Sequence, residues 1–194
     1  MTARPTILLL HGPNLNLLGQ REPHIYGTDT LEDYVAHATA KADDLGMNLV
    51  ALQSNHEGAL IDAIQAARGV HQAIIINPGA FTHYAWGIHD ALASFAGPVI
   101  EVHISNPNTR EPWRHTSVVS PVSKGTIAGF GIQGYGFAVE AVARLVNTIG
   151  SDPSDPSDPV GPADPVGPAD PVGPADPADP IDPADQVAPV GPAA

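Results

Sequence analysis

The first 150 residues alternate between short apolar runs and longer segments in which apolar residues recur at helical spacing. The short runs are rich in leucine and β-branched residues, which is typical of buried strands. They predict strands at 6–10, 48–53, 73–76 and 99–104, with a weaker one at 125–130. The longer segments predict helices at 30–44, 57–67, 85–95 and 134–149. Strand and helix therefore alternate throughout this region.

The ends of the first two predicted helices carry local signals. Asp29 and Glu32 resemble a capping box at the start of the first helix. Gly46 suits the exit from that helix, and Gly69 closes the second one. These signals support the helical assignment independently of the apolar periodicity.

Five strands that alternate with helices predict an α/β fold, in which a parallel sheet is covered by helices on both faces. The usual five-stranded solution is the flavodoxin-like strand order 2-1-3-4-5. Ligands of such sheets bind beyond the carboxyl ends of the strands, where strands one and three diverge. We therefore expect the chemistry of this protein in the loops that follow strands.

The composition changes sharply after Gly150. Residues 151–194 contain nine aspartates and no lysine or arginine, and proline occupies every third position from Pro153 to Pro183. Proline donates no backbone hydrogen bond and disfavours helix in the residue before it. We predict a flavodoxin-like domain at 1–150, followed at 151–194 by a disordered Asp-Pro/Gly-Pro repeat tail. A docking peptide for a proline-binding module is the alternative, and only composition supports it.

Charge and cysteine content exclude several classes of function. The formal net charge is −13, but residues 1–150 carry 12 acidic against 8 basic residues, which is too balanced to indicate nucleic-acid binding. The chain has no cysteine, so disulfides and thiolate chemistry are excluded and a reducing cytoplasm is the simplest setting. The first apolar run is too short for a signal peptide or a membrane span.

The loop after the first strand holds an arginine and a tyrosine, Arg21 and Tyr26. A free tyrosine has a pKa of about 10 and is a poor base at neutral pH. A nearby guanidinium favours the phenolate and lowers that pKa, so the pair is a candidate general base. The alternative is that Arg21 is an ordinary surface residue and that Tyr26 only packs against its neighbours. From these two residues alone, this alternative is favoured.

The fourth strand places Glu101 and His103 two residues apart, hence on the same face. The carboxylate would orient the imidazole and raise its pKa, which favours a proton donor. A buried histidine with a satisfied hydrogen bond fits the spacing equally well. His83 opens the third predicted helix and should line the same crevice, but a zinc site would require a further ligand at a recognisable spacing.

The run GFGIQG at 129–134 has the glycine spacing of a dinucleotide-binding loop. That motif also requires a following strand–helix–strand unit with an acidic residue, and here the chain enters its last helix instead. We interpret these glycines as a tight turn with close packing between helix and sheet. Lys41 and Lys124 are the only lysines. One lies on a polar helix face and the other before the fifth predicted strand, which argues against Schiff-base chemistry.

Several runs together point to a known family. They are GPNLNLLG (12–19) followed by REP (21–23) and YG (26–27), QSNHEG (53–58), NPGAFTH (77–83), EVHISN (101–106), Arg110-Glu111 with Arg114, and GIQGY (131–135). In this order, across residues 6 to 147, they resemble the signature of type II 3-dehydroquinases. The resemblance implies dehydration of 3-dehydroquinate to 3-dehydroshikimate through an enolate, as a step of the shikimate pathway, with no Schiff base, metal or organic cofactor.

The resemblance also implies catalytic roles for five residues. Tyr26 would remove the proton from C2 of the substrate, and Arg21 on the same mobile loop would hold its pKa down. Asn14 would position a water that stabilises the enolate oxygen. His103 would protonate the leaving C1 hydroxyl, and Glu101 would orient the histidine.

A second set of residues is implied in substrate binding: Asn77, His83, Asp90, Ile104, Ser105 and Arg114. The backbone amides of Ile104 and Ser105 would hold the carboxylate, and His83 and Arg114 the ring hydroxyls. Asp90 would reach the site of a neighbouring subunit, because family members assemble as dodecamers made of trimers. Two rival interpretations are a nucleotide- or flavin-binding module and a non-catalytic assembly protein.

Overall fold

The computed structural model describes residues 4–20 and 28–149, which form a five-stranded, all-parallel sheet. The strand order is β2-β1-β3-β4-β5, so the predicted order 2-1-3-4-5 is confirmed. The strands are β1 (Thr6–His11), β2 (Asn48–Gln53), β3 (Ala73–Asn77), β4 (Val99–His103) and β5 (Gly125–Ala128). The predicted tail at 151–194 lies outside the described residues.

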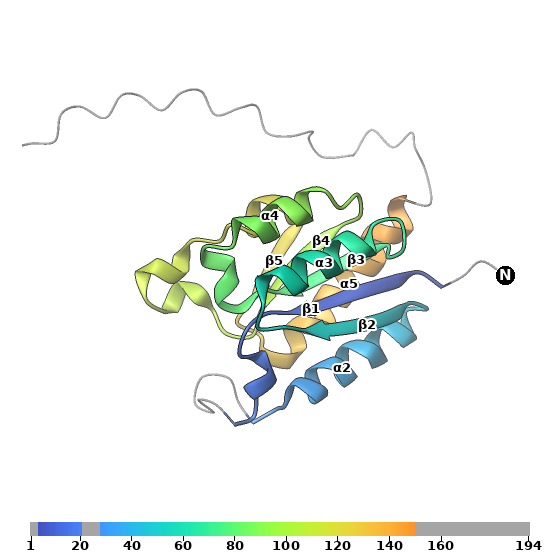
Figure 1. The fold of residues 1–194 in the computed structure, drawn as a ribbon. Helices are drawn as coiled ribbons and strands as arrows, with labels where there is room; N and C mark the ends of the chain where they lie inside the picture. The colour runs from blue at the N-terminus through green and yellow to red at the C-terminus, as the bar shows by residue number, and fades with distance from the viewer. Residues whose placement is uncertain (1–3, 21–27, 150–194) are drawn as a thin grey trace, which may run out of the picture. The chain divides into compact units, whose positions relative to one another are not determined.

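Two pairs of helices cover the sheet, one pair on each face (Figure 1). The helices are α2 (Leu31–Asp44), α3 (Glu57–Ala67), α4 (Trp86–Ala93) and α5 (Gly131–Ile149). α2 and α5 pack on one face, and α3 and α4 pack on the other. Among the described residues, no helix is long and apolar enough to cross a membrane.

The central strands supply apolar side chains to two cores at once. In β1, Ile7 and Leu9 pack beneath α2 and α5, whereas Leu8 and Leu10 pack beneath α3 and α4. All five residues of β3 are buried. Successive residues of a strand face opposite sides of a sheet, so a strand covered on both faces must be apolar throughout. This is why these strands read as continuous apolar runs.

The capping box of α2 lies one residue beyond the predicted position. Thr30 is the N-cap: its hydroxyl accepts a hydrogen bond from Asp33 N (3.3 Å), and Asp33 Oδ2 accepts one from Thr30 N (2.8 Å). The prediction that Asp29 and Glu32 form this box is therefore wrong. The reason is that Thr30 is still extended, with φ −84° and ψ 168°, and the helix begins at Leu31.

The residues around His83 also differ from the prediction. His83 does not open a helix but ends the 3₁₀ helix η2 (Gly79–His83), and α4 starts later, at Trp86. Three more 3₁₀ helices fill the connection from β4 to β5: η3 (Pro107–Thr109), η4 (Pro112–His115) and η5 (Ser120–Val122). Each of these three has a proline in its first turn, where the missing N–H costs nothing.

The glycine run at 129–134 forms the predicted turn into the last helix. Gly129 and Gly131 adopt positive φ angles of 89° and 54°, which favour glycine. The turn is so short that α5 begins at Gly131, three residues before the predicted start. The turn therefore joins β5 directly to α5.

β1 and β3 are held together at their carboxyl ends. Gly12 N donates a hydrogen bond to Asn77 O (2.7 Å), immediately after the last paired residues of the two strands. A Cβ atom at Gly12 would lie 2.1 Å from Pro78 O, so only glycine fits here. Beyond this contact the segments that follow β1 and β3 diverge, and the candidate site lies in the space between them.

Candidate active site

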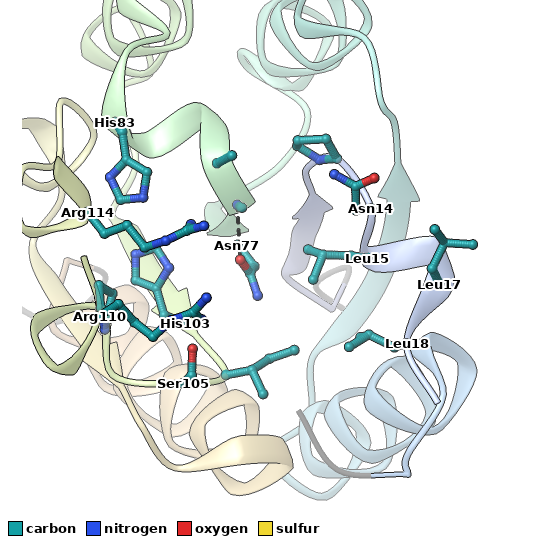
Figure 2. A pocket seen from close by; sticks show the side chains of 15 residues that line it. Asn14, Leu15, Leu17, Leu18, Asn77, His83, His103, Ser105, Arg110 and Arg114 are labelled. Carbon is teal, nitrogen blue, oxygen red and sulfur yellow. Dashed lines mark hydrogen bonds between the residues drawn. The ribbon is translucent and has the colours of Figure 1, made fainter. Parts of the chain in front are cut away.

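A cavity of about 140 Å³ lies at the carboxyl ends of β1, β3 and β4, where parallel sheets of this order bind ligands. Figure 2 shows two unlike walls: a basic wall with His83, His103, Arg110 and Arg114, and a leucine wall from the segment after β1. Asn77 lies between them. The cavity can therefore hold a small polar or anionic molecule against an apolar surface.

The segment after β1 is held in place by the segment after β2. Asn14 has φ 65°, a left-handed conformation that asparagine tolerates better than most residues. Its backbone N donates to Asn55 Oδ1 (2.8 Å), and Gln53 Nε2 donates to Gly12 O (3.2 Å). Leu15 and Leu18 then anchor the segment in the core. Asn14 thereby lines the cavity from a fixed backbone position.

Asn77 is fixed at both ends of its amide. Its Oδ1 accepts a hydrogen bond from Gly79 N (3.1 Å), and its Nδ2 donates to the hydroxyl of the buried Tyr135 (2.9 Å). Nδ2 carries two N–H groups, so one remains available for a ligand in the cavity. Tyr135 in turn stacks on His11, with ring centroids 5.6 Å apart. The sequence alone did not reveal that Tyr135 supports Asn77, because the two residues are 58 positions apart.

Glu101 and His103 form the predicted pair. His103 Nε2 lies 2.8 Å from Glu101 Oε1, and the glutamate is completely buried. Burial alone would raise the pKa of Glu101, but hydrogen bonds from His103, Thr82 and Ser117 outweigh it and lower the pKa. An ionised carboxylate accepts only, so Nε2 carries a proton. Nδ1 is then the nitrogen that can exchange a proton with a ligand.

Three hydroxyl groups that the sequence analysis did not identify surround the Glu101 carboxylate. Thr82 donates to Oε1, Ser117 lies 3.0 and 3.1 Å from the two oxygens, and Thr126 Oγ1 lies 3.4 Å from Oε2. They come from η2, from the connection after η4 and from β5. Serine and threonine are common in loops and strands, so their residue types give no signal of this role.

His83 and Arg114 lie together in the basic wall, and Trp113 contacts both. His83 Nδ1 lies 2.7 Å from Thr116 O, so Nδ1 carries the proton and Nε2 is left as an acceptor. The Arg114 guanidinium carbon lies 4.0 Å from the centroid of the Trp113 ring, and the His83 ring meets that indole edge-on at 5.2 Å. Glu111 Oε2 accepts from Arg114 Nε (2.7 Å).

The structure brings together most of the predicted site residues that it describes. Asn14, Asn77, His83, His103, Ile104, Ser105 and Arg114 all line the cavity, and Glu101 lies behind His103. Asp90 does not line it but is exposed on α4. Arg21 and Tyr26 lie outside the described residues. Arg110 also lines the cavity, beside Arg114.

Two alternative kinds of site find no support in this geometry. Within residues 4–20 and 28–149, no group of three or more histidine, aspartate or glutamate side chains is placed to hold a metal ion. The glycine turn at 129–134, the candidate phosphate loop, is not among the residues that line the cavity. The arrangement instead suits proton transfer: a buried carboxylate, an imidazole oriented by it, and a basic wall for an anionic ligand.

Comparisons with known proteins agree on one family. Residues 5–143 match the model of the family described as Dehydroquinase class II. The chain is 59% identical over 138 residues to a catabolic 3-dehydroquinase from Aspergillus fumigatus, which covers 71% of this chain and 92% of that protein. It is 58% identical over 139 residues to a 3-dehydroquinate dehydratase from Corynebacterium glutamicum, with 72% and 96% covered.

Solved structures show the same similarity. A type II dehydroquinase from Butyrivibrio crossotus superposes with a TM-score of 0.71 at 46% identity, covering 73% of this chain and 99% of that one. A type II dehydroquinase from Propionibacterium acnes superposes with a TM-score of 0.70 at 42% identity, with the same coverage. Fold and sequence therefore point to the same family.

Proposed function

We propose that this chain, which belongs to the class II dehydroquinase family, removes water from 3-dehydroquinate to give 3-dehydroshikimate. The observation that carries the proposal is the hydrogen bond between His103 and the buried Glu101 at the edge of a cavity with a basic wall. A hydro-lyase needs a group that protonates the departing hydroxyl. An imidazole held by an ionised carboxylate is suited to that role.

The charge of the cavity suits a substrate that carries a carboxylate and several hydroxyl groups. We assign the substrate carboxylate to the backbone amides of Ile104 and Ser105, at the point where the chain leaves β4. We assign the ring hydroxyls to His83 and Arg114 on the basic wall. A hydroxyl group both donates and accepts hydrogen bonds. It can donate to His83 Nε2 and accept from the Arg114 guanidinium.

The elimination requires a base as well as an acid. We assign the base to Tyr26, which takes the C2 proton as a phenolate, and we assign Arg21 to stabilising that phenolate. The electrons of the C–H bond form the enolate, whose oxygen is stabilised through a water held by Asn14. The C1–O bond then breaks, and the hydroxyl leaves as water with a proton from His103. Asn77 holds that hydroxyl in line with the imidazole.

The remaining proposals concern the setting of the enzyme. We place it in the cytoplasm as a step of the shikimate pathway, with no metal or organic cofactor in the reaction. We propose an assembly of twelve chains built from trimers, in which the exposed Asp90 of α4 enters the site of a neighbouring subunit. Residues 151–194 serve as a solubilising tail outside the catalytic domain at 1–150.

A single pair of assays tests the proposed function. The full chain should convert 3-dehydroquinate into a product with the ultraviolet absorbance of a conjugated enone carboxylate. The Tyr26→Phe variant deletes only the phenolic oxygen and should lose turnover, while circular dichroism shows an unchanged fold. An inactive full chain would refute the function. An active Tyr26→Phe variant would refute the assignment of the base alone.

A further inference from the structure

The Glu101 carboxylate is held by hydroxyl groups in addition to the imidazole. His103 and three hydroxyls, from Thr82, Ser117 and Thr126, contact its two oxygens. Charge-assisted hydrogen bonds of this kind are stronger than neutral ones and fix the orientation of the group they contact. The orientation of the carboxylate therefore depends on where these hydroxyls are placed.

Ser117 is placed to contact both carboxylate oxygens at once. Its Oγ lies 3.0 Å from Oε1 and 3.1 Å from Oε2 of Glu101. The same Oγ accepts hydrogen bonds from the backbone N of Val119 (3.1 Å) and of Ser120 (2.8 Å). A hydroxyl has one proton and two lone pairs. With both lone pairs engaged by backbone N–H groups, the proton lies between the two remaining neighbours, the Glu101 carboxylate and Thr82 Oγ1, which is 2.8 Å away. Thr82 donates its own proton to Glu101 Oε1, so the Ser117 hydroxyl supports the carboxylate both directly and through Thr82.

The segment that carries Ser117 is itself fixed to the site on both sides. Thr116 O lies 2.7 Å from His83 Nδ1, and Val118 N donates to Thr82 O (2.7 Å). One short piece of chain thus contacts the carboxylate behind His103 and the histidine in the basic wall. It holds the two groups at a set separation on the basic wall of the cavity.

We propose that Ser117 is a positioning residue, whose hydroxyl fixes the Glu101 carboxylate and thereby the His103 imidazole in the orientation needed for proton donation. Ser117 does not line the cavity, so it acts through Glu101 and not on the substrate. The inference rests on the proposed function, because it assigns Ser117 a part in the same proton transfer.

The test uses three variants of the full chain, assayed with 3-dehydroquinate across pH. Ser117→Ala removes the hydroxyl, and Ser117→Thr keeps it at a side chain that is only partly buried. Ser123→Ala is the matched control, because its hydroxyl donates to Val119 O (3.0 Å) and contacts no part of Glu101. Thermal unfolding of each variant separates a change in stability from a change in catalysis.

For Ser117→Ala we expect kcat at neutral pH to fall about tenfold, with KM within about twofold of wild type. The acid side of the pH profile should stay in place, because it reports protonation of the Tyr26 phenolate, whose ordinary pKa of about 10 lies far above that of Glu101. Ser117→Thr should restore the rate, and Ser123→Ala should match wild type.

The outcomes separate this inference from the function on which it rests. If wild type fails to turn over 3-dehydroquinate, the proposed function is refuted. If wild type is active and Ser117→Ala keeps the same kcat, the role of Ser117 is refuted. A Ser117→Ala variant whose kcat falls together with a rise in KM and a loss of thermal stability, and is not restored by Ser117→Thr, would also overturn it, because that combination indicates a purely structural serine.

Discussion

At the scale of single residues, the site depends on side chains whose own partners are fixed. Asn77 is held by Tyr135 and Gly79 N, His103 by Glu101, and His83 by Thr116 O. Each cavity-facing group therefore has a defined donor or acceptor left for a ligand. Such preorganisation avoids reorganisation of the protein during the reaction.

Glu101→Gln should separate the effect of the carboxylate charge from its size. The amide is isosteric, but it cannot stabilise an imidazolium at His103, so we expect kcat to fall about 100-fold. KM should change little, because Glu101 lies behind the cavity and does not contact the substrate. Steady-state kinetics at several pH values measure both constants. A variant with normal kcat and raised KM would assign Glu101 to binding and contradict this account.

Trp113→Leu should weaken substrate binding without slowing the chemical step. Trp113 is 55% exposed, yet its ring supports both Arg114 and His83. A cation–π contact at an exposed site contributes about 0.5–1 kcal/mol, so KM should rise about two- to fivefold with kcat unchanged. Trp86→Leu changes the other tryptophan, on α4, and is the control. Equal kinetics for the two variants would show that Trp113 does not support the basic wall.

The sequence predicted those site residues that come from short local patterns. Glu101 and His103 share a strand face at a spacing of two, which can be read directly. Ser117 and Thr126 reach the same carboxylate from 16 and 25 positions away. Their contact depends on the path of the chain through η4 and η5, where the sequence predicted no element. Their contacts with Glu101 could not be predicted, because these contacts depend on the course of the chain and not on residue type.

At the scale of elements, the sequence predicted where strands run better than where helices begin. β1 and β3 each extend one residue beyond the predicted apolar run, to the polar residues His11 and Asn77. A strand predicted from its apolar residues ends at the last apolar position. The prediction therefore misses the polar residue that ends each of these strands. The start of α2 was misplaced because Asp29, Thr30, Glu32 and Asp33 offer two overlapping capping boxes. Only the backbone conformation of Thr30 decides between them.

Gly12→Ala should disrupt the junction between β1 and β3. The new Cβ would lie 2.1 Å from Pro78 O, so the two strand ends must separate. We expect a loss of at least about 3 kcal/mol in the free energy of unfolding, together with loss of activity. Gly58→Ala is the control. Gly58 lies in α3, and a Cβ atom added there would meet no other atom within 4 Å. This substitution should raise the free energy of unfolding by about 0.5–1 kcal/mol. Urea unfolding measures both changes. An unaltered Gly12→Ala variant would show that the junction tolerates a side chain.

At the scale of the whole molecule, the buried polar residues beneath the cavity make stability depend on pH. Burial lowers the pKa of His11 from 6.5 to about 4, although a contact with the Leu52 backbone opposes the shift. The unfolded chain therefore takes up a proton at higher pH than the folded one. The stability that His11 contributes is complete above about pH 6.5 and is lost as the pH falls toward about 4.

His11→Asn should remove this part of the acid sensitivity. A difference of about 2.5 pKa units corresponds to about 3 kcal/mol across the window from pH 6.5 to 4. Wild type should lose that much more unfolding free energy than His11→Asn between pH 7 and pH 4, even if the variant is less stable at pH 7. Urea unfolding at the two pH values gives the comparison. Equal losses in the two proteins would show that His11 does not stay neutral in the fold.

The strand order followed from the sequence because four of the five strands carry a strong local signal, the fifth carries a weaker one, and the rules for parallel sheets leave few strand orders. Those same rules predicted the edge of the sheet at which the cavity lies. The shape of the cavity did not follow, because it depends on how the segments after β1, β3 and β4 pack against one another.

The most direct test of the account is turnover of 3-dehydroquinate by the purified full chain, before and after treatment with borohydride in the presence of substrate. We expect a rise in ultraviolet absorbance from the conjugated product, at the same rate after treatment, because no imine forms for borohydride to trap. No rise with folded protein would contradict the proposed function. Activity that borohydride abolishes would contradict the mechanism built on Tyr26 and His103.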